Sequence, residues 1–375
     1  MRVSSAKRLA LSRQKKGRKT LWVRTAAGPR IGFGHLRRTL TLARKLRRLA
    51  RPLFLLDSRD HWSTEQVASA GFAHRQFQPQ RPWPALEPPA ALLIDTRRKA
   101  GLDLLVAEAH RRKVPVASIH DLGLVPLASD VIIDGSMIST ARVHPRRGAR
   151  CFRGTPYLAL DEACARLHKQ PKRIRPRIAK VVVNLGGGNG SKTIRTILQG
   201  LRAANSPLDV VGLPGFCSWG QERLTDIEWN PLRFRWAARE ANAVRLMFDA
   251  DLVISAGGLA AYEALCVGAP LCALSCDRHQ ARTVEAMARA GACLNLGRGA
   301  LLKSSDVLRR FRELDKKPEL RRRISARARR LVDGEGTQRV ARVLRAVIER
   351  GSQPPSRFSK AGTRSAVSAD REPLV

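Results

Sequence analysis

Residues 250–280 read ADLVISAGGLAAYEALCVGAPLCALSCDRHQ and decide the fold. The run 251–255 is rich in β-branched residues and predicts a buried parallel strand. Gly257 and Gly258 then mark a turn, and residues 259–267 have helical spacing. A strand, a glycine turn, a helix and a second strand in this order predict a unit of an α/β sheet.

The glycine turn suits a phosphate group. Backbone N–H groups beside Gly257 and Gly258 can approach an anion closely, and the helix that follows adds unpaired donors and the positive end of a dipole. Glu263 stands one turn into that helix, where its carboxylate can accept hydrogen bonds from both hydroxyls of a ribose. The pattern therefore predicts a nucleoside diphosphate site. The alternative is a tight turn followed by a solvated glutamate.

This stretch resembles the carboxy-terminal signature of family 28 glycosyltransferases, where a glycine pair, a Glu, a Gly-x-Pro and an Asn-Gln follow one another. The matching residues are Gly257, Gly258, Glu263, Gly268, Pro270 and Gln280. His279 stands in place of the Asn, and Leu259 and Ala260 replace small hydroxyl residues. The resemblance implies a two-domain GT-B architecture and a UDP-sugar as the bound nucleotide-sugar. It places the donor on Gly257, Gly258, Glu263, His279 and Gln280.

A second informative stretch lies near the start of the chain. Residues 21–24 read as a strand, apolar residues from 36 to 46 recur with a helical period, and His35 stands at the start of that helix. The positive end of a helix favours a neutral imidazole, so His35 can serve as a general base; a capping or packing histidine is the alternative. Arg37 occupies the place of the third glycine of a dinucleotide fingerprint, which disfavours an NAD site.

Residues 24–43 resemble the amino-terminal signature of the SpsG type of spore-coat polysaccharide protein and of the pseudaminic-acid-pathway nucleotide-sugar hydrolase. The matches are Arg24, Ile31, Gly32, Gly34, His35, Arg38, Leu40, Leu42 and Ala43, and Ala26 replaces an Asp. The resemblance implies that His35 activates the attacking hydroxyl or water. It also makes Gly32, Gly34 and Arg38 candidates for substrate binding.

Strand-like runs alternate with helical stretches along the chain, at 52–56, 91–95, 114–119, 130–134, 181–185, 209–213, 232–236 and 292–296. This alternation predicts parallel sheets with helices on both faces, and so two doubly wound Rossmann-like domains facing each other over a cleft. Asp95 and Asp121 each follow a strand, at the edge where open α/β sheets bind ligands; helix capping is the alternative. Gly187 lies in a glycine loop that lacks the ending of a P-loop and suits a sugar or phosphate.

Changes in composition divide the chain into domains and tails. We expect a disordered basic tail over 1–19, an acceptor and catalytic domain over 20–165 and a basic, proline-containing linker over 166–180. A nucleotide-sugar-binding domain over 181–350 and a disordered tail over 351–375 follow. An apolar stripe between Val340 and Ile348 is expected to pack back across the domains.

Charge and cysteine usage limit the function further. The chain holds 70 Lys and Arg against 31 Asp and Glu, a formal net charge of +39 that attracts polyanions of any class. Its seven cysteines show no metal-ligand spacing and read, like Cys272, as small buried side chains in a reducing compartment. No apolar run is long enough to span a membrane. We expect a cytoplasmic protein that contacts the anionic inner face of the membrane peripherally.

The expected function is therefore transfer from a UDP-sugar to a sugar acceptor in bacterial surface polysaccharide or glycan synthesis, without a cofactor or metal. Hydrolysis of the UDP-sugar is the first alternative, and Ala26 and His279, which depart from the hydrolase pattern, favour transfer. A non-catalytic binder of polyanions or nucleic acid is the second alternative. No helix-turn-helix, zinc finger or aromatic ribonucleoprotein string supports nucleic acid.

Overall fold

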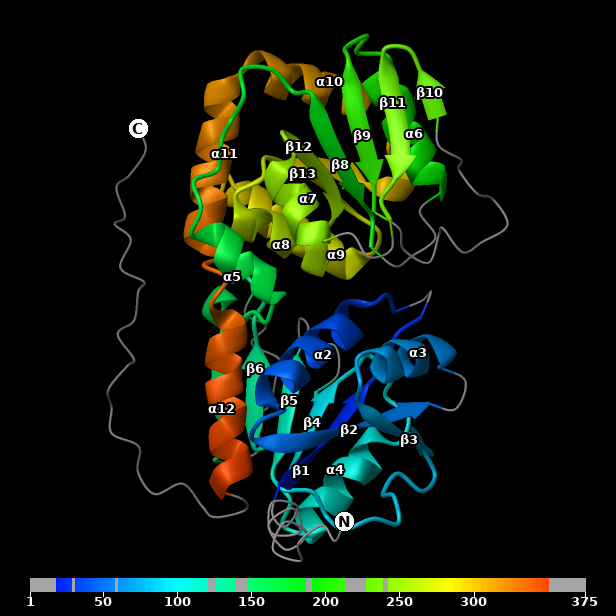
Figure 1. Ribbon diagram of the computed structural model, residues 1–375, viewed down its shortest axis with the longest axis vertical. Helices are drawn as coiled ribbons and strands as arrows, with labels where there is room; N and C mark the ends of the chain where they lie inside the picture. The colour runs from blue at the N-terminus through cyan, green and yellow to red at the C-terminus, as the bar shows by residue number, and fades with distance from the viewer. Residues whose placement is uncertain are drawn as a thin grey trace, which may run out of the picture.

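A computed structural model describes residues 18–28, 31–57, 60–120, 126–138, 148–186, 191–213, 227–238 and 242–350, and these form two α/β domains (Figure 1). Within the described residues the first domain has a seven-stranded parallel sheet in the order β3-β2-β1-β4-β5-β6-β7. Its strands are β1 (Lys19–Thr25), β2 (Ala50–Asp57), β3 (Ala73–Phe77), β4 (Ala91–Asp95), β5 (Val116–His120), β6 (Val131–Asp134) and β7 (Arg150–Arg153). Its helices are α2 (Gly34–Leu46), α3 (His61–Ser69), α4 (Leu102–Arg111) and the 3-10 turn η1 (Thr155–Tyr157).

The second domain repeats the plan. Its described sheet has the order β10-β11-β9-β8-β12-β13-β14, and every pairing is parallel except that of β10 with β11. The strands are β8 (Lys180–Asn184), β9 (Leu208–Gly212), β10 (Ile227–Trp229), β11 (Leu232–Trp236), β12 (Leu252–Ala256), β13 (Leu271–Ser275) and β14 (Leu294–Arg298). The helices are α5 (Glu162–His168), α6 (Ser191–Arg202), α7 (Ala243–Asp249), α8 (Leu259–Val267), α9 (Arg278–Arg289), η3 (Gly299–Leu301), α10 (Ser304–Lys316) and α11 (Pro318–Leu331).

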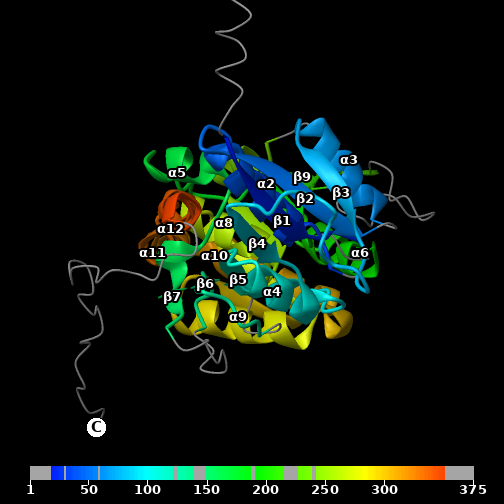
Figure 2. The same cartoon turned by 90° about the horizontal axis from the view of Figure 1, so that it is seen from below.

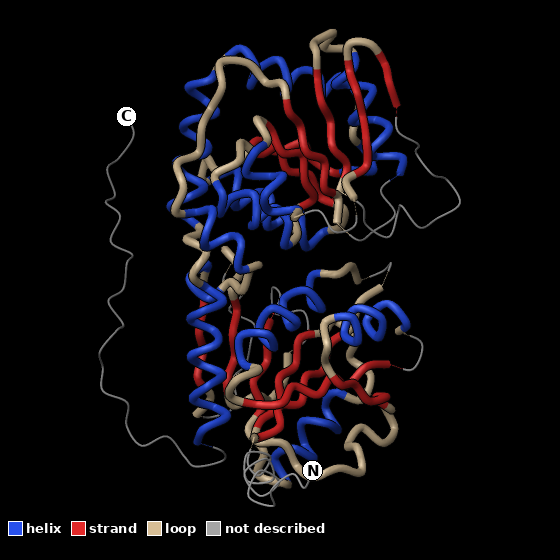
Figure 3. The backbone as a smooth tube through the Cα atoms, viewed as in Figure 1, coloured by secondary structure: helices blue, strands red, loops and turns tan. Residues whose placement is uncertain are grey.

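Helices lie on both sides of each sheet (Figure 3), and alternation along the central strands places a separate core on each face. In β1, Leu21 and Val23 pack under α2, whereas Trp22 packs with the apolar face of α4. In β8, Val182 faces α8, and Val181 and Val183 face α6 and α10. Both domains are therefore three-layered and doubly wound, which confirms the predicted fold class.

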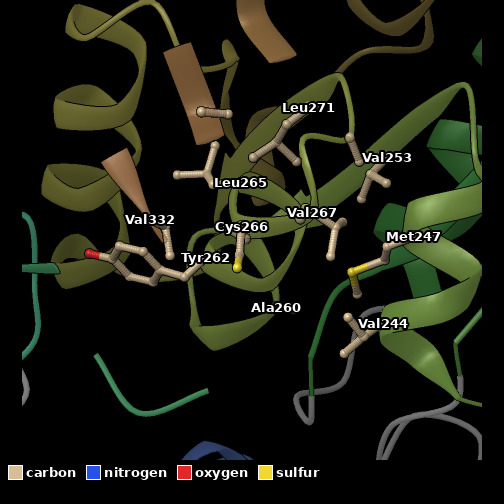
Figure 4. Close-up of a cluster of buried hydrophobic side chains, with 14 of the residues drawn as sticks. Val244, Met247, Val253, Ala260, Tyr262, Leu265, Cys266, Val267, Leu271 and Val332 are labelled. Atoms are coloured by element: carbon tan, nitrogen blue, oxygen red, sulfur yellow. The ribbon is translucent and has the colours of Figure 1, made fainter. Parts of the chain in front are cut away.

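Helix α8 is the centre of the second domain, and its side chains are apolar apart from Glu263 and the hydroxyl of Tyr262. Every residue from 260 to 267 is buried, because the helix is enclosed between its own sheet and α5, α7 and α11 (Figure 4). The helix ends at Gly268, whose φ of +71° is the left-handed conformation that suits glycine. A Cβ there would lie 2.7 Å from Cδ of Arg329. The Gly-x-Pro of the sequence signature is thus the helix stop.

The chain crosses between the domains twice, at adjacent places. Leu158 and Leu160 pack in the second domain while Ala159 packs in the first, and the chain returns just after Val332. The two crossings touch, since Thr337 Oγ1 donates to Leu160 O at 2.6 Å. This crossing precedes the predicted linker 166–180, which instead lies along the second domain, where Lys172 donates to the carbonyls of Phe248 and Ala250.

The last described helix, α12 (Gly336–Arg350), belongs to the first domain. Its apolar stripe from Val340 to Ile348 packs against α2 and the first-domain sheet (Figure 2). The predicted second domain of residues 181–350 therefore differs from the structure in this helix. The stripe was correctly read as apolar, but sequence alone did not indicate which domain it covers. The expected tails, 1–17 and 351–375, lie outside the described residues.

The strands that the sequence did not predict are at or near sheet edges. Only Phe77 of β3 is buried, β7 reads RCFR, and β10 is a three-residue partner of β11. Edge strands bury too little apolar surface to show a clear pattern. The central strands and the helix 259–267 agree with prediction.

Candidate functional site

The predicted site residues form two groups, one in each domain, and the two groups lie at equivalent places in the two sheets. The strand order reverses between β1 and β4 in the first domain and between β8 and β12 in the second. In open α/β sheets, ligands bind beyond the carboxyl ends of the strands at such a reversal. His35 follows β1 and Asp95 ends β4, while Gly257 and Gly258 follow β12. All four residues thus flank one of the two reversal points.

His35 is held in one orientation by charged neighbours. It lies in the first turn of α2 and is 5% exposed. Its Nδ1 is 2.7 Å from Oδ1 of Asp95. Arg38 donates to both oxygens of the same carboxylate, through Nε and Nη2, each at 2.7 Å. Because a carboxylate can only accept, Nδ1 carries a proton, and in the neutral ring the lone pair is therefore on Nε2.

Asp95 is fully buried and ionised. Burial alone would raise the pKa of its carboxyl, but the charges of Arg38 and His35 and their hydrogen bonds lower that pKa to about 2. Since both oxygens are already engaged and the side chain has no exposure, Asp95 does not face a ligand in this arrangement. In this structure Asp95 contacts His35 and Arg38, and its predicted contact with substrate stays a prediction. Arg38 is likewise buried and contacts Asp95, so its predicted contact with substrate also stays a prediction.

The glycine turn of the second domain is tightly packed from behind. A Cβ on Gly257 would lie 2.5 Å from Cγ2 of Val284 and 3.0 Å from Gln280 O, so α9 excludes any side chain there. A Cβ on Gly258 would meet only Nε2 of Gln280, at 3.9 Å. Gly258 is the N-cap of α8, and a helix N-terminus of this kind suits a phosphate through its backbone N–H groups and the positive end of its dipole.

Helix α9 contributes the last part of the predicted nucleotide site. Asp277 caps it by accepting from Gln280 N at 2.8 Å, and Oε1 of Gln280 accepts from Cys276 N at 3.0 Å. Gln280 thus lies beside the glycine pair, as the signature implies. His279 is half-buried on the same turn. Gly187, also predicted here, lies outside the described residues, as does Asp121.

The first turns of α2 and α8 meet across the domain boundary. A Cβ on Gly34 would lie 3.9 Å from Cβ of Leu259. Gly32 precedes this turn with a φ of +74°, and its N–H donates to Gly28 O at 2.7 Å. The glycines of the first signature therefore shape the chain where α2 begins, and they bring two helix N-termini together.

Glu263 does not lie open to a ribose. Its residue exposure is 0%, and Arg37 of the first domain donates to Oε1 at 3.0 Å and to Oε2 at 3.5 Å. Burial, which outweighs the effect of Arg37, raises the pKa of its carboxyl, and the nearby Asp161 adds to the rise. Sequence reasoning missed Arg37, although its spacing of three from Gly34 places it on the same face of α2.

A second buried histidine near Asp95 was also missed. His120 ends β5, is 4% exposed, and places Nε2 2.8 Å from Oγ of Ser118. Burial lowers its pKa to about 4 against the opposing charge of Asp95, so the ring is neutral. Its Nδ1 has no hydrogen-bond partner within the described part of the chain. A histidine at a strand end was the available sequence signal.

No group of His, Cys, Asp and Glu among the described residues is arranged to hold a metal ion. In the same residues, no helix combines the length and apolar character needed to cross a bilayer. Cys272 is buried, and burial raises the pKa of its thiol well above the usual range, in agreement with its reading as a core residue.

Comparison with known proteins agrees with this architecture. No family model matches the chain. The spore coat polysaccharide biosynthesis protein SpsG of Bacillus subtilis (strain 168) is 29% identical over 228 residues, which cover 59% of this chain and 66% of SpsG, slightly less than two thirds of its length.

Among solved structures, MurG of Acinetobacter baumannii superposes with a TM-score of 0.62 at 14% identity, covering 88% of this chain and 99% of that one. The calicheamicin glycosyltransferase CalG4 superposes with a TM-score of 0.58 at 16% identity, over 89% of this chain and 99% of that one. At such identities the likeness establishes the fold. The chain is therefore similar to SpsG in sequence, and it has the two-domain GT-B fold of these glycosyltransferases.

Proposed function

We propose that the chain is a glycosyltransferase that uses a nucleotide-sugar, a UDP-sugar in particular, to build a bacterial surface polysaccharide or glycan. The observation that supports this most directly is the His35–Asp95 pair, 2.7 Å apart, on the domain opposite the glycine-pair helix N-terminus. The similarity to SpsG and the shared fold of the glycosyltransferases support the same reaction class.

In the proposed reaction His35 is the general base. Asp95 accepts a hydrogen bond from Nδ1–H, which leaves the Nε2 lone pair to take a proton from an acceptor hydroxyl. The deprotonated oxygen attacks the anomeric carbon of the donor, and the bond from that carbon to the diphosphate oxygen breaks. Asp95 is ionised throughout, so it stabilises the imidazolium that forms.

In the proposed reaction the second domain binds the diphosphate, which is the leaving group. The first N–H groups of α8, next to Gly258, would hold the diphosphate and stabilise the charge that grows on it. Gln280 lies beside this turn and borders the same position. In this scheme the charge on the leaving group is met by backbone donors and a helix dipole.

The test has a binding step and a chemical step. UDP should bind the wild-type protein with little dependence on salt, and Glu263→Gln should weaken that binding, in a calorimetric titration at low and moderate salt. UDP release from UDP-sugars should then fall by about 10²- to 10⁴-fold in His35→Asn, while UDP affinity is retained.

The alternatives give different results. Release of free sugar without any acceptor would establish hydrolysis instead of transfer. Binding that vanishes with salt equally in wild type and Glu263→Gln would indicate a polyanion binder, because screening removes only long-range charge attraction.

A further inference from the structure

Arg37 closes off the carboxylate that the nucleotide ribose is expected to use. The two oxygens of Glu263 lie 3.0 and 3.5 Å from the two terminal nitrogens of Arg37. Glu263 belongs to α8 of the second domain and Arg37 to α2 of the first. A carboxylate with 0% exposure cannot accept a hydrogen bond from an incoming hydroxyl. Ribose can reach Glu263 only after Arg37 has moved away.

The ion pair and the approach of Gly34 to Leu259 lie on one side of each helix. Gly34 and Arg37 are three residues apart on α2, and Leu259 and Glu263 are four apart on α8. A Cβ added to Gly34 would lie 3.9 Å from Cβ of Leu259, and Arg37 reaches Glu263 one turn further along. Opening this contact would therefore uncover the α8 N-terminus and the Glu263 carboxylate together.

The two partners are unequally fixed. The side chain of Arg37 is 40% exposed, whereas that of Glu263 is 1% exposed within an apolar helix. Arg37 can leave toward solvent without disturbing a core, but Glu263 stays in place, near Asp161 and Cys164 of the α5 segment. Glu263 raises the pKa of the Arg37 guanidinium, so the pair is charged on the arginine side across the whole physiological range.

We propose that Arg37 is a gate on the nucleotide site: it holds the domains together over Glu263, and a nucleoside must displace it to bind. That the bound molecule is a nucleoside rests on the proposed function, whereas the gate itself rests on the contact between Arg37 and Glu263. Because part of the binding energy is used to break the ion pair, the apparent affinity for nucleoside is lower than the affinity of the opened site.

Arg37→Met tests the gate and Arg44→Met is its matched control. Arg44 lies on the exposed face of the same helix, two turns further on, so both variants remove one positive charge from α2. Uridine is the probe because it carries the ribose but no phosphate. Loss of an arginine could weaken phosphate binding directly, and uridine avoids that effect. Calorimetry should show uridine binding strengthened by about tenfold in Arg37→Met relative to Arg44→Met.

A second variant covers the case in which Arg37→Met does not fold. Arg37→Lys keeps the charge but loses the two-point contact with the carboxylate, so uridine binding should strengthen by a smaller factor. Affinity that is unchanged or lower in Arg37→Met and Arg37→Lys than in the control would overturn the gate, since a merely structural or ligand-binding arginine gives that result.

Amide hydrogen exchange separates the gate from the proposed function. Exchange in the first turns of α2 and α8 should rise equally in Arg37→Met and Glu263→Gln and no further in the double variant, because each single change breaks the same contact. If no variant binds uridine or UDP, the proposed function fails and exchange alone decides the gate. Unchanged protection in both single variants would show that the pair does not hold the domains.

Discussion

The reversal points of the two sheets have the same topology but are built from different parts of the chain. In the first domain the point is filled by side chains, with His35 and Arg38 both bound to Asp95. In the second it is bare backbone, because the packing of α9 excludes any side chain from Gly257. A fixed imidazole can move a proton, and an open backbone can hold an anion. The comparison shows that one repeated topology offers two different kinds of site, one built from fixed side chains and one from backbone.

The largest effect is expected when the side-chain cluster at the reversal point of the first domain loses Asp95. Asp95→Asn leaves Arg38 buried without its counter-charge, so it should lower the free energy of unfolding by about 3–5 kcal/mol. It should also slow UDP release by about 10²- to 10⁴-fold, because Nδ1 of His35 loses the acceptor that fixes its tautomer. Urea denaturation and a turnover assay measure the two quantities.

Asp57→Asn is the control for that variant. Asp57, at the end of β2, accepts a hydrogen bond from the buried Arg24 at 2.7 Å, and in the described part of the chain no contact with His35 is present. Stability should fall and turnover per folded molecule should stay near wild type. Full turnover in Asp95→Asn would remove the basis for calling the two reversal points different in kind.

At the reversal point of the second domain, an added methyl group should lower the stability at Gly257 and not at Gly258. Gly257→Ala places Cβ 2.5 Å from Val284 and should destabilise the protein by about 1–3 kcal/mol. Gly258→Ala has its nearest neighbour at 3.9 Å and should leave the free energy of unfolding almost unchanged. Equal melting temperatures for the two variants would contradict the close packing of α9 behind the turn.

The smallest expected effect is an opposite dependence on pH. The lowered pKa of Asp95 means that its stabilising contribution is complete above the ordinary carboxyl value of about 4 and is lost as pH falls toward about 2. The raised pKa of Glu263 has the opposite sign, because the folded state then binds the proton more tightly and stability falls as pH rises through that pKa.

Unfolding free energies measured across acid and neutral pH can assign each slope. Glu263→Gln should remove the decrease that begins above the ordinary carboxyl value and leave the acid-side loss intact, and Asp95→Asn should do the reverse. The slope of a single group cannot exceed about 1.4 kcal/mol per pH unit. An unchanged slope above the ordinary carboxyl value in Glu263→Gln would show that its burial does not govern its protonation.

Sequence predicted the fold well because central strands and buried helices carry strong periodic signals. The helix 259–267 agreed residue for residue, since a glycine pair precedes it and Gly268 stops it. The site was predicted less completely. His35 and Asp95 were each identified, but a separation of 60 residues gave no sign that they form a pair. Arg37 was missed because its partner Glu263 lies 226 residues away in the other domain.

The return of α12 to the first domain has a consequence for synthesis on the ribosome. The first domain is translated early, yet the apolar faces of α2 and its sheet are covered by residues near 340–348. Lys19, at the start of β1, donates to Ile348 O, so the two ends of the described chain close one core. A nascent chain must therefore hold an incomplete first domain while the second domain emerges, and during that interval an apolar face is open to chaperones.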